Sequence, residues 1–97
     1  MSFADDVRAN AAFVNDGNPF YLQLMKLQEE AGEVASAWIG YVGNPRPEKR
    51  ATRADVIKEL CDVALGSMVA LENLGEDSAD RIAERAAVVR ARFEALR

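Results

Sequence analysis

Two pairs of carboxylates, each with its members three residues apart, lie within long apolar stretches that have helical spacing. Glu30 and Glu33 form the first pair, and Glu59 and Asp62 form the second. Residues three apart share one face of an α-helix, so each pair points in one direction. Ionised carboxylates are costly in apolar surroundings unless a positive charge lies between them. The pattern therefore predicts two packed helices whose acidic faces meet and bring four oxygen donors together.

The segments around the pairs indicate burial on both helices. Residues 63–71 read VALGSMVAL, a run without a charge. A helix that is apolar nearly all round is usually a buried one. On the first long helix an apolar stripe at spacings of three or four residues is expected to form the packing face: Leu24, Leu27, Ala31, Val34, Trp38 and Val42. Solvated acids on a helix surface are the alternative interpretation, which is stronger for Glu29 than for Glu59 and Asp62.

Four converging carboxylates are typical of a site for a hard divalent cation, with Mg²⁺ expected and Mn²⁺ as the second candidate. The chain has no histidine and one cysteine. Di-iron Glu-x-x-His sites, most zinc sites and acyl-transfer triads are thereby excluded. Mg²⁺ bridges phosphate oxygens and activates water, so hydrolysis of a phosphoanhydride is the simplest reaction for such a site. Glu29, next to the first pair, is the candidate to orient or deprotonate that water.

Four further residues are candidate substrate contacts, and each has a structural alternative. Lys26 is a cation on the first acidic face, and Trp38 has an aromatic ring suited to stacking on a base. The other two, Arg50 and Arg53, are cations of the basic linker. The alternatives are an ion pair between Lys26 and Glu29 or Glu30, packing of Trp38 in a core or interface, and a solvated linker. Cys61 is expected to be a small buried hydrophobe.

Capping and breaking residues divide the chain into four expected helices. Ser2 with Asp5 opens a short helix, Asn18 and Pro19 begin a long one to about Tyr41, and Thr52 with Asp55 begins another to about Asn73. Asp77 or Ser78 begins the last helix, and glycine and proline residues at 43–47 open a linker that runs to residue 51. No alternating run indicates a strand. The prediction is one all-α domain over residues 1–97, a helical bundle built on a central antiparallel hairpin.

Composition bears on partners and location. The 97 residues are 49% hydrophobic, more than a small monomer easily hides, so a homodimer or homotetramer is expected to complete the bundle. The net charge is −4, but without the five site acids eleven acids remain against twelve bases. No broad basic field indicates a nucleic-acid partner. The first ten residues do not resemble a signal peptide and no apolar run approaches about 18 residues. A cytoplasmic protein without a membrane partner is therefore expected.

The motif Glu29-Glu30-x-x-Glu33 followed by Glu59-x-x-Asp62 resembles the EExxE…ExxD signature of the MazG-like, all-α nucleoside triphosphate pyrophosphohydrolases. The similarity extends through LQLMKLQEEAGEVASAW, ELCDVALGSMVALENLG and RARFEAL. The resemblance implies Mg²⁺-dependent hydrolysis of a (deoxy)nucleoside triphosphate to a monophosphate and pyrophosphate. It also implies metal ligation by Glu30, Glu33, Glu59 and Asp62, assistance from Glu29, and assembly into dimers or tetramers.

Two departures from related patterns keep other functions open. The last helix of MazG proteins often carries an Asn-x-Lys that faces the triphosphate, whereas the register here places Ala86 and Val88 at those positions. Phosphoribosyl-ATP pyrophosphohydrolases, which have a similar EExxE, are the second enzyme candidate; they usually carry Tyr-His soon after ExxD, and this chain has Leu65-Gly66-Ser67. The non-enzymatic alternative is a helical oligomerisation module that binds metal or nucleotide without turnover.

Overall fold

The chain forms four α-helices and one short 3₁₀ helix in the computed structural model, which describes residues 1–43 and 46–97. The elements are α1 (Phe3–Asn15), α2 (Phe20–Tyr41), η1 (Pro47–Lys49), α3 (Arg53–Asn73) and α4 (Ser78–Ala95). No strand occurs in either described range, so the all-α prediction is confirmed there. Of the turn expected at 43–47, Asn44 and Pro45 lie outside the described residues.

Side-chain caps set where three of the helices begin. Ser2 and Asp5 form a reciprocal capping box at α1, and Thr52 and Asp55 form another at α3. The Asp77 side chain accepts a hydrogen bond from the Asp80 backbone at α4. These caps satisfy backbone N–H groups that have no partner inside the helix. Asp55, which the sequence pattern also places on the acidic face of α3, therefore caps the helix.

The expected cap of α2 is wrong. The Asn18 side chain donates hydrogen bonds to the Val14 and Asp16 carbonyls, 3.1 and 3.0 Å away, and so finishes α1. Pro19 is the N-cap residue of α2 and contributes no side-chain hydrogen bond. The last turn of α1 has carbonyl groups without helical partners, and these compete successfully for the Asn18 amide.

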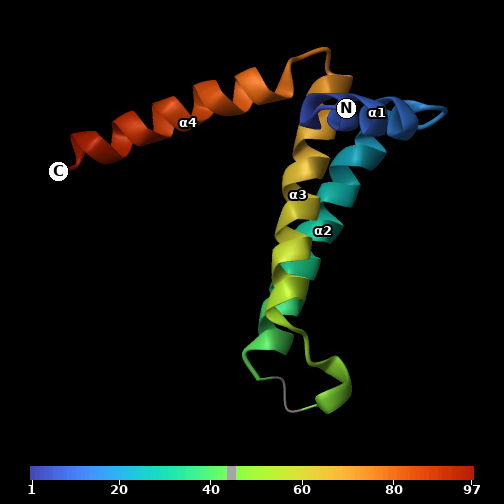
Figure 1. Ribbon diagram of the computed structural model, residues 1–97, viewed down its shortest axis with the longest axis vertical. Helices are drawn as coiled ribbons and strands as arrows, with labels where there is room; N and C mark the ends of the chain where they lie inside the picture. The colour runs from blue at the N-terminus through green and yellow to red at the C-terminus, as the bar shows by residue number, and fades with distance from the viewer. Residues whose placement is uncertain (44–45) are drawn as a thin grey trace.

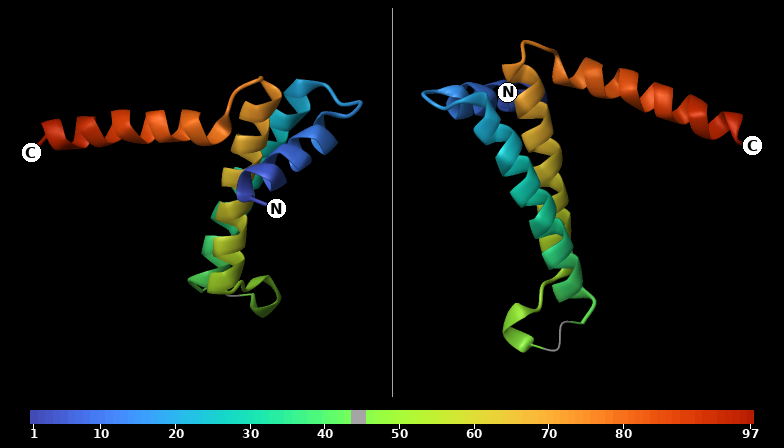
Figure 2. Two further views of the ribbon diagram at one scale, coloured as in Figure 1. Left: turned by 45° about the horizontal axis from the view of Figure 1, so that its top comes forward. Right: turned by 180° about the vertical axis from the view of Figure 1, so that it is seen from behind.

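Helices α2 and α3 lie side by side and run in opposite directions, as Figures 1 and 2 show. The less exposed residues of α2 recur every three or four positions and are Gln23, Leu27, Glu30, Val34, Ala37 and Gly40. Those of α3 include Val56, Glu59, Val63, Gly66 and Ala70. The expected stripe on α2 is therefore partly wrong, because Leu24, Trp38 and Val42 are 49%, 53% and 59% exposed. The actual packing face is rotated so that Glu30 lies on it.

Helix α1 crosses the end of α3 that is remote from the linker (Figure 1). Val7 and Ala11 of α1 are buried, as are Met68 and Val69 of α3. The Arg8 guanidinium lies 3.7 Å from Glu72 and 3.6 Å from Asp77. This small core holds three helix ends together and leaves the middle of the α2–α3 pair uncovered.

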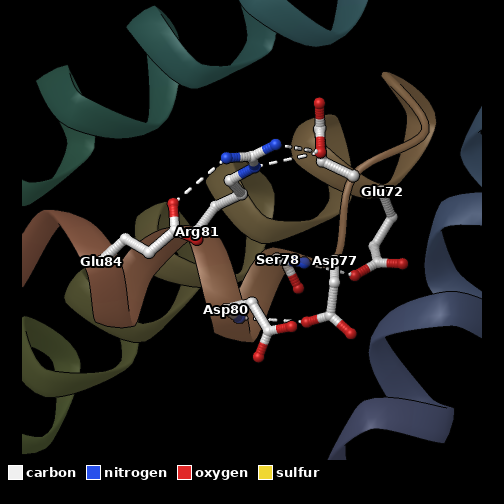
Figure 3. A network of polar contacts seen from close by, with 7 residues as sticks. Glu72, Asp77, Ser78, Asp80, Arg81 and Glu84 are labelled. Carbon is white, nitrogen blue, oxygen red and sulfur yellow. Dashed lines mark hydrogen bonds and ion pairs between the residues drawn. The ribbon is translucent and has the colours of Figure 1, made fainter.

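Helix α4 extends away from the other helices, as all views in Figures 1 and 2 show. The turn before it is fixed by polar contacts (Figure 3): the Glu72 carboxylate accepts from the Ser78 backbone at 2.8 Å, and Arg81 pairs with Glu76 and Glu84 at 2.9 and 3.1 Å. Beyond Ser78, every residue of α4 except Val89 is exposed. The radius of gyration is 16.3 Å, against about 12.5 Å for a compact domain of this length.

The expectation that Cys61 is buried is wrong, since its thiol is exposed. It shares one face of α3 with Ile57, Leu60 and Ala64, which are also exposed. Their exposure means that this face of α3 is not packed against α2, and α4 extends away from α3 (Figure 1). None of the helices in the described ranges combines the length and apolarity required to cross a membrane.

Candidate functional site

Glu30 and Glu59 enter the α2–α3 interface from opposite helices. The Oε2 atom of each is buried and has no hydrogen-bond partner among the described residues. The Glu59 side chain as a whole is 19% exposed. A buried carboxylate oxygen without a donor costs more free energy than almost any other side-chain arrangement. A cation bound between the two helices, or a proton on one of the carboxylates, would compensate two such oxygens in one interface.

Asp62 lies one turn beyond Glu59 on α3 and carries an ion pair. The Lys58 ammonium is 3.1 Å from Asp62 Oδ2 and 3.6 Å from Glu59 Oε1. The hydrogen bond to Asp62 raises the pKa of Lys58. Lys58 is itself 66% exposed. It therefore neutralises part of the charge on Asp62 and Glu59 from the solvent side, while the buried Glu59 Oε2 has no partner among the described residues.

The other three predicted metal ligands all act on the pKa of Glu30 through their charges. Burial is the largest influence and raises the pKa of Glu30; Asp62, Glu33 and Glu59 raise it further, and Lys26 opposes them. Glu33 is exposed to solvent one turn along α2. Within residues 1–43 and 46–97 no three acidic or cysteine side chains converge closely enough to enclose an ion. Glu59 and Asp62 are therefore near enough for their charges to act on Glu30, but the three carboxylates do not form a closed cluster, and Glu33 is exposed.

This raised pKa predicts a pH dependence of folding. The ordinary pKa of glutamate is 4.5, and that of folded Glu30 is higher, so above pH 4.5 the folded state binds more protons than the unfolded state. Stability of the metal-free protein therefore falls as pH rises through the folded pKa. We expect urea midpoints measured between about pH 5 and pH 7 to fall more for the wild type than for Glu30→Gln.

Three other carboxylates with shifted pKa values serve as the control in these pH-dependent urea titrations. The pKa values of Asp5, Asp55 and Glu72 are lowered by hydrogen bonds to Ser2, Thr52 and Ser78. Their contributions are lost only as pH falls below the ordinary values, and they are common to both proteins. Parallel pH profiles for the wild type and Glu30→Gln would show that Glu30 is not destabilised by burial.

Gly66 allows α3 to approach α2 at the acidic cluster. A Cβ at this position would lie 2.8 Å from Leu27 Cδ2 and 3.0 Å from Glu30 Oε2. Gly40 has a different role, because its Cβ would meet the Lys49 carbonyl at 2.6 Å and Ala51 of the linker. Close packing therefore explains both glycines, and at Gly66 the packing partner includes the Glu30 carboxylate.

The other predicted site residues are distributed along the hairpin. Lys26 is 3.4 Å from Glu29, whose side chain is 66% exposed. Trp38 packs its ring 5.7 Å from that of Tyr41, near the linker end of α2. Arg50 follows η1 and Arg53 begins α3, about 9 Å along the helix from Glu59. Lys26 is the one member of the predicted substrate set that the structure places beside the carboxylates and a pocket.

That pocket has a volume of about 470 Å³ and lies between α1, α2 and α3. Glu30, Asp62 and Lys26 line one part of it, and residues that sequence reasoning missed line the rest: Asn10, Phe13, Asn18 and Gln23. Only Gln23 gave a signal in the sequence. A polar residue at the spacing of an apolar face, one turn before Leu27, indicates a buried amide with a specific partner.

Comparison with protein-family models, curated proteins and solved structures finds no match to this chain. The chemistry of its own carboxylates and pocket is therefore the basis for a functional interpretation.

Proposed function

We propose that this chain is a Mg²⁺-dependent nucleoside triphosphate pyrophosphohydrolase that converts a (deoxy)nucleoside triphosphate and water into the monophosphate and pyrophosphate. The observation that carries the proposal is the pair of buried oxygens, Glu30 Oε2 and Glu59 Oε2, that have no hydrogen-bond donor. They come from two different helices, and Asp62 lines the same pocket as Glu30. The resemblance of the acidic motif to MazG-like enzymes supports the same reaction.

The residues fit a hard divalent cation. Mg²⁺ usually takes a few carboxylates and completes its shell with water and substrate phosphates. In this proposal Glu30, Glu59 and Asp62 would close around the ion when it binds. Glu33, one turn from Glu30, joins them when its side chain rotates inward. When bound, Mg²⁺ or Mn²⁺ screens the phosphate charge and activates a water.

Glu29 and Lys26 have separate roles in this proposal. Glu29 is exposed next to Glu30 and accepts from Lys26, so it is available to orient the attacking water and take its proton. Lys26 lines the pocket and neutralises phosphate oxygens there. Substrate contacts by Trp38, Arg50 and Arg53 stay predictions, because none of the three lines this pocket.

The departure in the last helix bears on phosphate binding. Ala86 and Val88 occupy the positions of the family's Asn-x-Lys, and no residue of α4 lines the pocket. In this proposal the metal and Lys26 therefore supply the positive charge that the triphosphate requires. The same departure supports the non-enzymatic alternative, a helical oligomerisation module that binds metal or nucleotide without turnover.

One assay separates these functions. The protein is incubated with canonical and modified nucleoside triphosphates and with phosphoribosyl-ATP, each with Mg²⁺ or with EDTA, and the products are quantified. We expect equal amounts of pyrophosphate and monophosphate, formed only with the metal. Release of inorganic phosphate and a diphosphate would contradict the proposal. Activity on phosphoribosyl-ATP alone would identify the alternative enzyme, and no product from any of them would favour the binding module.

We also propose that the chain assembles with itself as a homodimer or homotetramer, which completes a bundle around the α2–α3 hairpin. Large apolar side chains are exposed on α3 and α4, including Ile57, Leu60, Ile82 and Phe93. Burying one such side chain contributes about 1.5–3 kcal/mol. Size-exclusion chromatography with light scattering is expected to give the molar mass of a dimer or tetramer for the wild type and a smaller molar mass for Leu60→Asp. A wild-type monomer, or unchanged assembly of Leu60→Asp, would contradict this.

A further inference from the structure

Gln23 lines the pocket between α1, α2 and α3 and has an unused donor. The residue is 7% exposed, and its Oε1 accepts a hydrogen bond from Asn73 Nδ2 at 2.9 Å. Its Nε2 is buried without a partner among the described residues. A buried amide group that lacks an acceptor is rare and costly. Because the oxygen is committed to Asn73, the amide nitrogen is the atom left for a ligand.

Two asparagines in the same pocket present the opposite polarity. Asn10 Nδ2 donates to the Asp6 carbonyl at 2.8 Å, and Asn18 Nδ2 donates to the Val14 and Asp16 carbonyls. Both residues line the pocket with Gln23. Since their amide nitrogens are committed to the backbone of α1, their amide oxygens are the atoms available to accept. The pocket therefore combines a donor with acceptors.

The remaining wall suits a flat ring. Phe13, near the end of α1, lines the pocket and is 82% exposed. Val14, Leu22 and Val69 add aliphatic surface. An exposed aromatic face beside aliphatic walls is the usual platform on which a nucleobase stacks.

The base-binding residues and the carboxylates of this pocket are separated by about the length of a nucleotide. Glu30 lies seven residues after Gln23 on α2, which is about 10.5 Å along the helix axis. Glu30, Asp62 and Lys26 line the same pocket. A ring held at Gln23 and Phe13 thus places a phosphate attached through a sugar near the carboxylates, where the proposed metal binds.

We propose that this pocket selects nucleobases with a lactam edge, a carbonyl beside a ring N–H, and that Gln23 Nε2 donates to the carbonyl. Uracil, thymine, guanine and hypoxanthine have this edge, whereas adenine and cytosine present an amino group beside an unprotonated ring nitrogen. The asparagine oxygens accept from the ring N–H. The selection rests on the proposed function for the orientation of the phosphates, but not for the recognition of the base.

Inosine and adenosine monophosphates provide a matched pair, because they differ only at this edge of the purine. Calorimetric titration in EDTA is expected to show inosine monophosphate binding at least about tenfold more tightly than adenosine monophosphate. Uridine and cytidine monophosphates should differ in the same direction. Equal affinities within both pairs or a reversed order would overturn the proposal. If the carboxylates repel every monophosphate in EDTA, the same titration with the uncharged nucleosides inosine and adenosine replaces it, and no binding of inosine would overturn the proposal.

Variants of the pocket assign the preference to Gln23. Gln23→Met removes the donor at similar volume and is expected to reduce the inosine preference to within about threefold. Gln28→Met, at an exposed position of the same helix, should retain it. Phe13→Ala truncates an exposed ring and should weaken all monophosphates by about tenfold without changing their order. An undiminished preference in a folded Gln23→Met, shown by its melting curve, would also overturn the proposal.

The design keeps this inference separate from the hydrolytic reaction. Monophosphates contain no phosphoanhydride and EDTA removes divalent cations, so binding and its base preference are measured without turnover. A protein that prefers inosine monophosphate but releases no pyrophosphate from any triphosphate retains the base pocket and loses the proposed enzyme. A protein that hydrolyses all triphosphates equally and shows no monophosphate preference retains the enzyme and loses the pocket.

Discussion

Replacing Glu59 by glutamine is expected to lower the rate of triphosphate hydrolysis by at least about 100-fold while the metal-free protein melts at the same or a higher temperature. The substitution preserves the shape of the side chain and removes one of two buried charges. It also replaces a carboxylate whose Oε2 is buried without a hydrogen-bond donor by a neutral amide. Relief of buried repulsion explains the retained stability, and loss of a metal ligand explains the lost turnover.

Asp62→Asn is the second member of this test, and Glu84→Gln is the control. Glu84 pairs with Arg81 on α4, away from the carboxylates, so its substitution should leave turnover unchanged. The structural alternative makes the opposite prediction for the first two variants. If Glu59 and Asp62 serve mainly as ion-pair partners of Lys58, their substitution without metal will lower the melting temperature, and that result would contradict the account.

Gly66→Val is expected to destabilise the protein by about 1–3 kcal/mol and to reduce turnover at the same time. The new side chain meets Leu27 Cδ2 and Glu30 Oε2, which lie 2.8 and 3.0 Å from the position of a Cβ. Leu27 has to change rotamer and the two helices have to separate locally. Since the Glu30 carboxylate is displaced with them, the loss of activity should persist at temperatures where the variant is fully folded. Urea unfolding and initial-rate measurements test the two effects separately.

Gly32→Ala is the matched control for this prediction. Gly32 is an interior residue of α2, and nothing lies within 4 Å of the position of its Cβ. Alanine is favoured over glycine in a helix by about 0.8–1 kcal/mol, so this variant should be more stable and equally active. Destabilisation by Gly32→Ala would mean that this face of α2 is covered by another chain. Undiminished activity of Gly66→Val would contradict the role given to Gly66 in positioning Glu30.

The sequence predicted the helices well because their ends depend on local chemistry. The capping boxes at Ser2 and Thr52 involve residues three apart, and the structure contains both. The spacing of the acidic residues also predicted that their helix faces can meet. The charges of Glu59 and Asp62 do act on Glu30, and a metal site built from these residues stays a prediction.

The rotation of α2 was not predictable from its apolar residues. Leu24 and Gln23 are neighbours 100° apart around the helix, and the periodicity of hydrophobic residues favoured Leu24. The structure buries Gln23 and leaves Leu24 about half exposed. Tertiary hydrogen bonding decides the matter, because Gln23 pairs with Asn73, 50 residues away in the chain.

The exposure of Cys61 and of α4 has a different origin. An apolar residue is buried only if some element covers it, and α4 lies away from α3 (Figure 1). Assembly with further copies of the chain was expected from the sequence to complete the bundle, and a pattern within one chain does not show which residues such copies cover. The contacts of Glu72 with Ser78 and of Glu76 with Arg81 join the turn to the start of α4 and hold the helix in this direction. Such contacts across a turn leave no periodic pattern in a sequence.

The most direct test of the account is the effect of Mg²⁺ on the melting temperature of the wild type and of Glu59→Gln at neutral pH. A ligand that binds only the folded state stabilises it in proportion to the logarithm of its concentration above the dissociation constant. The account predicts that Mg²⁺ raises the melting temperature of the wild type and has little effect on Glu59→Gln. Equal shifts in both proteins, or no shift in the wild type at saturating Mg²⁺, would contradict a metal site between Glu30 and Glu59.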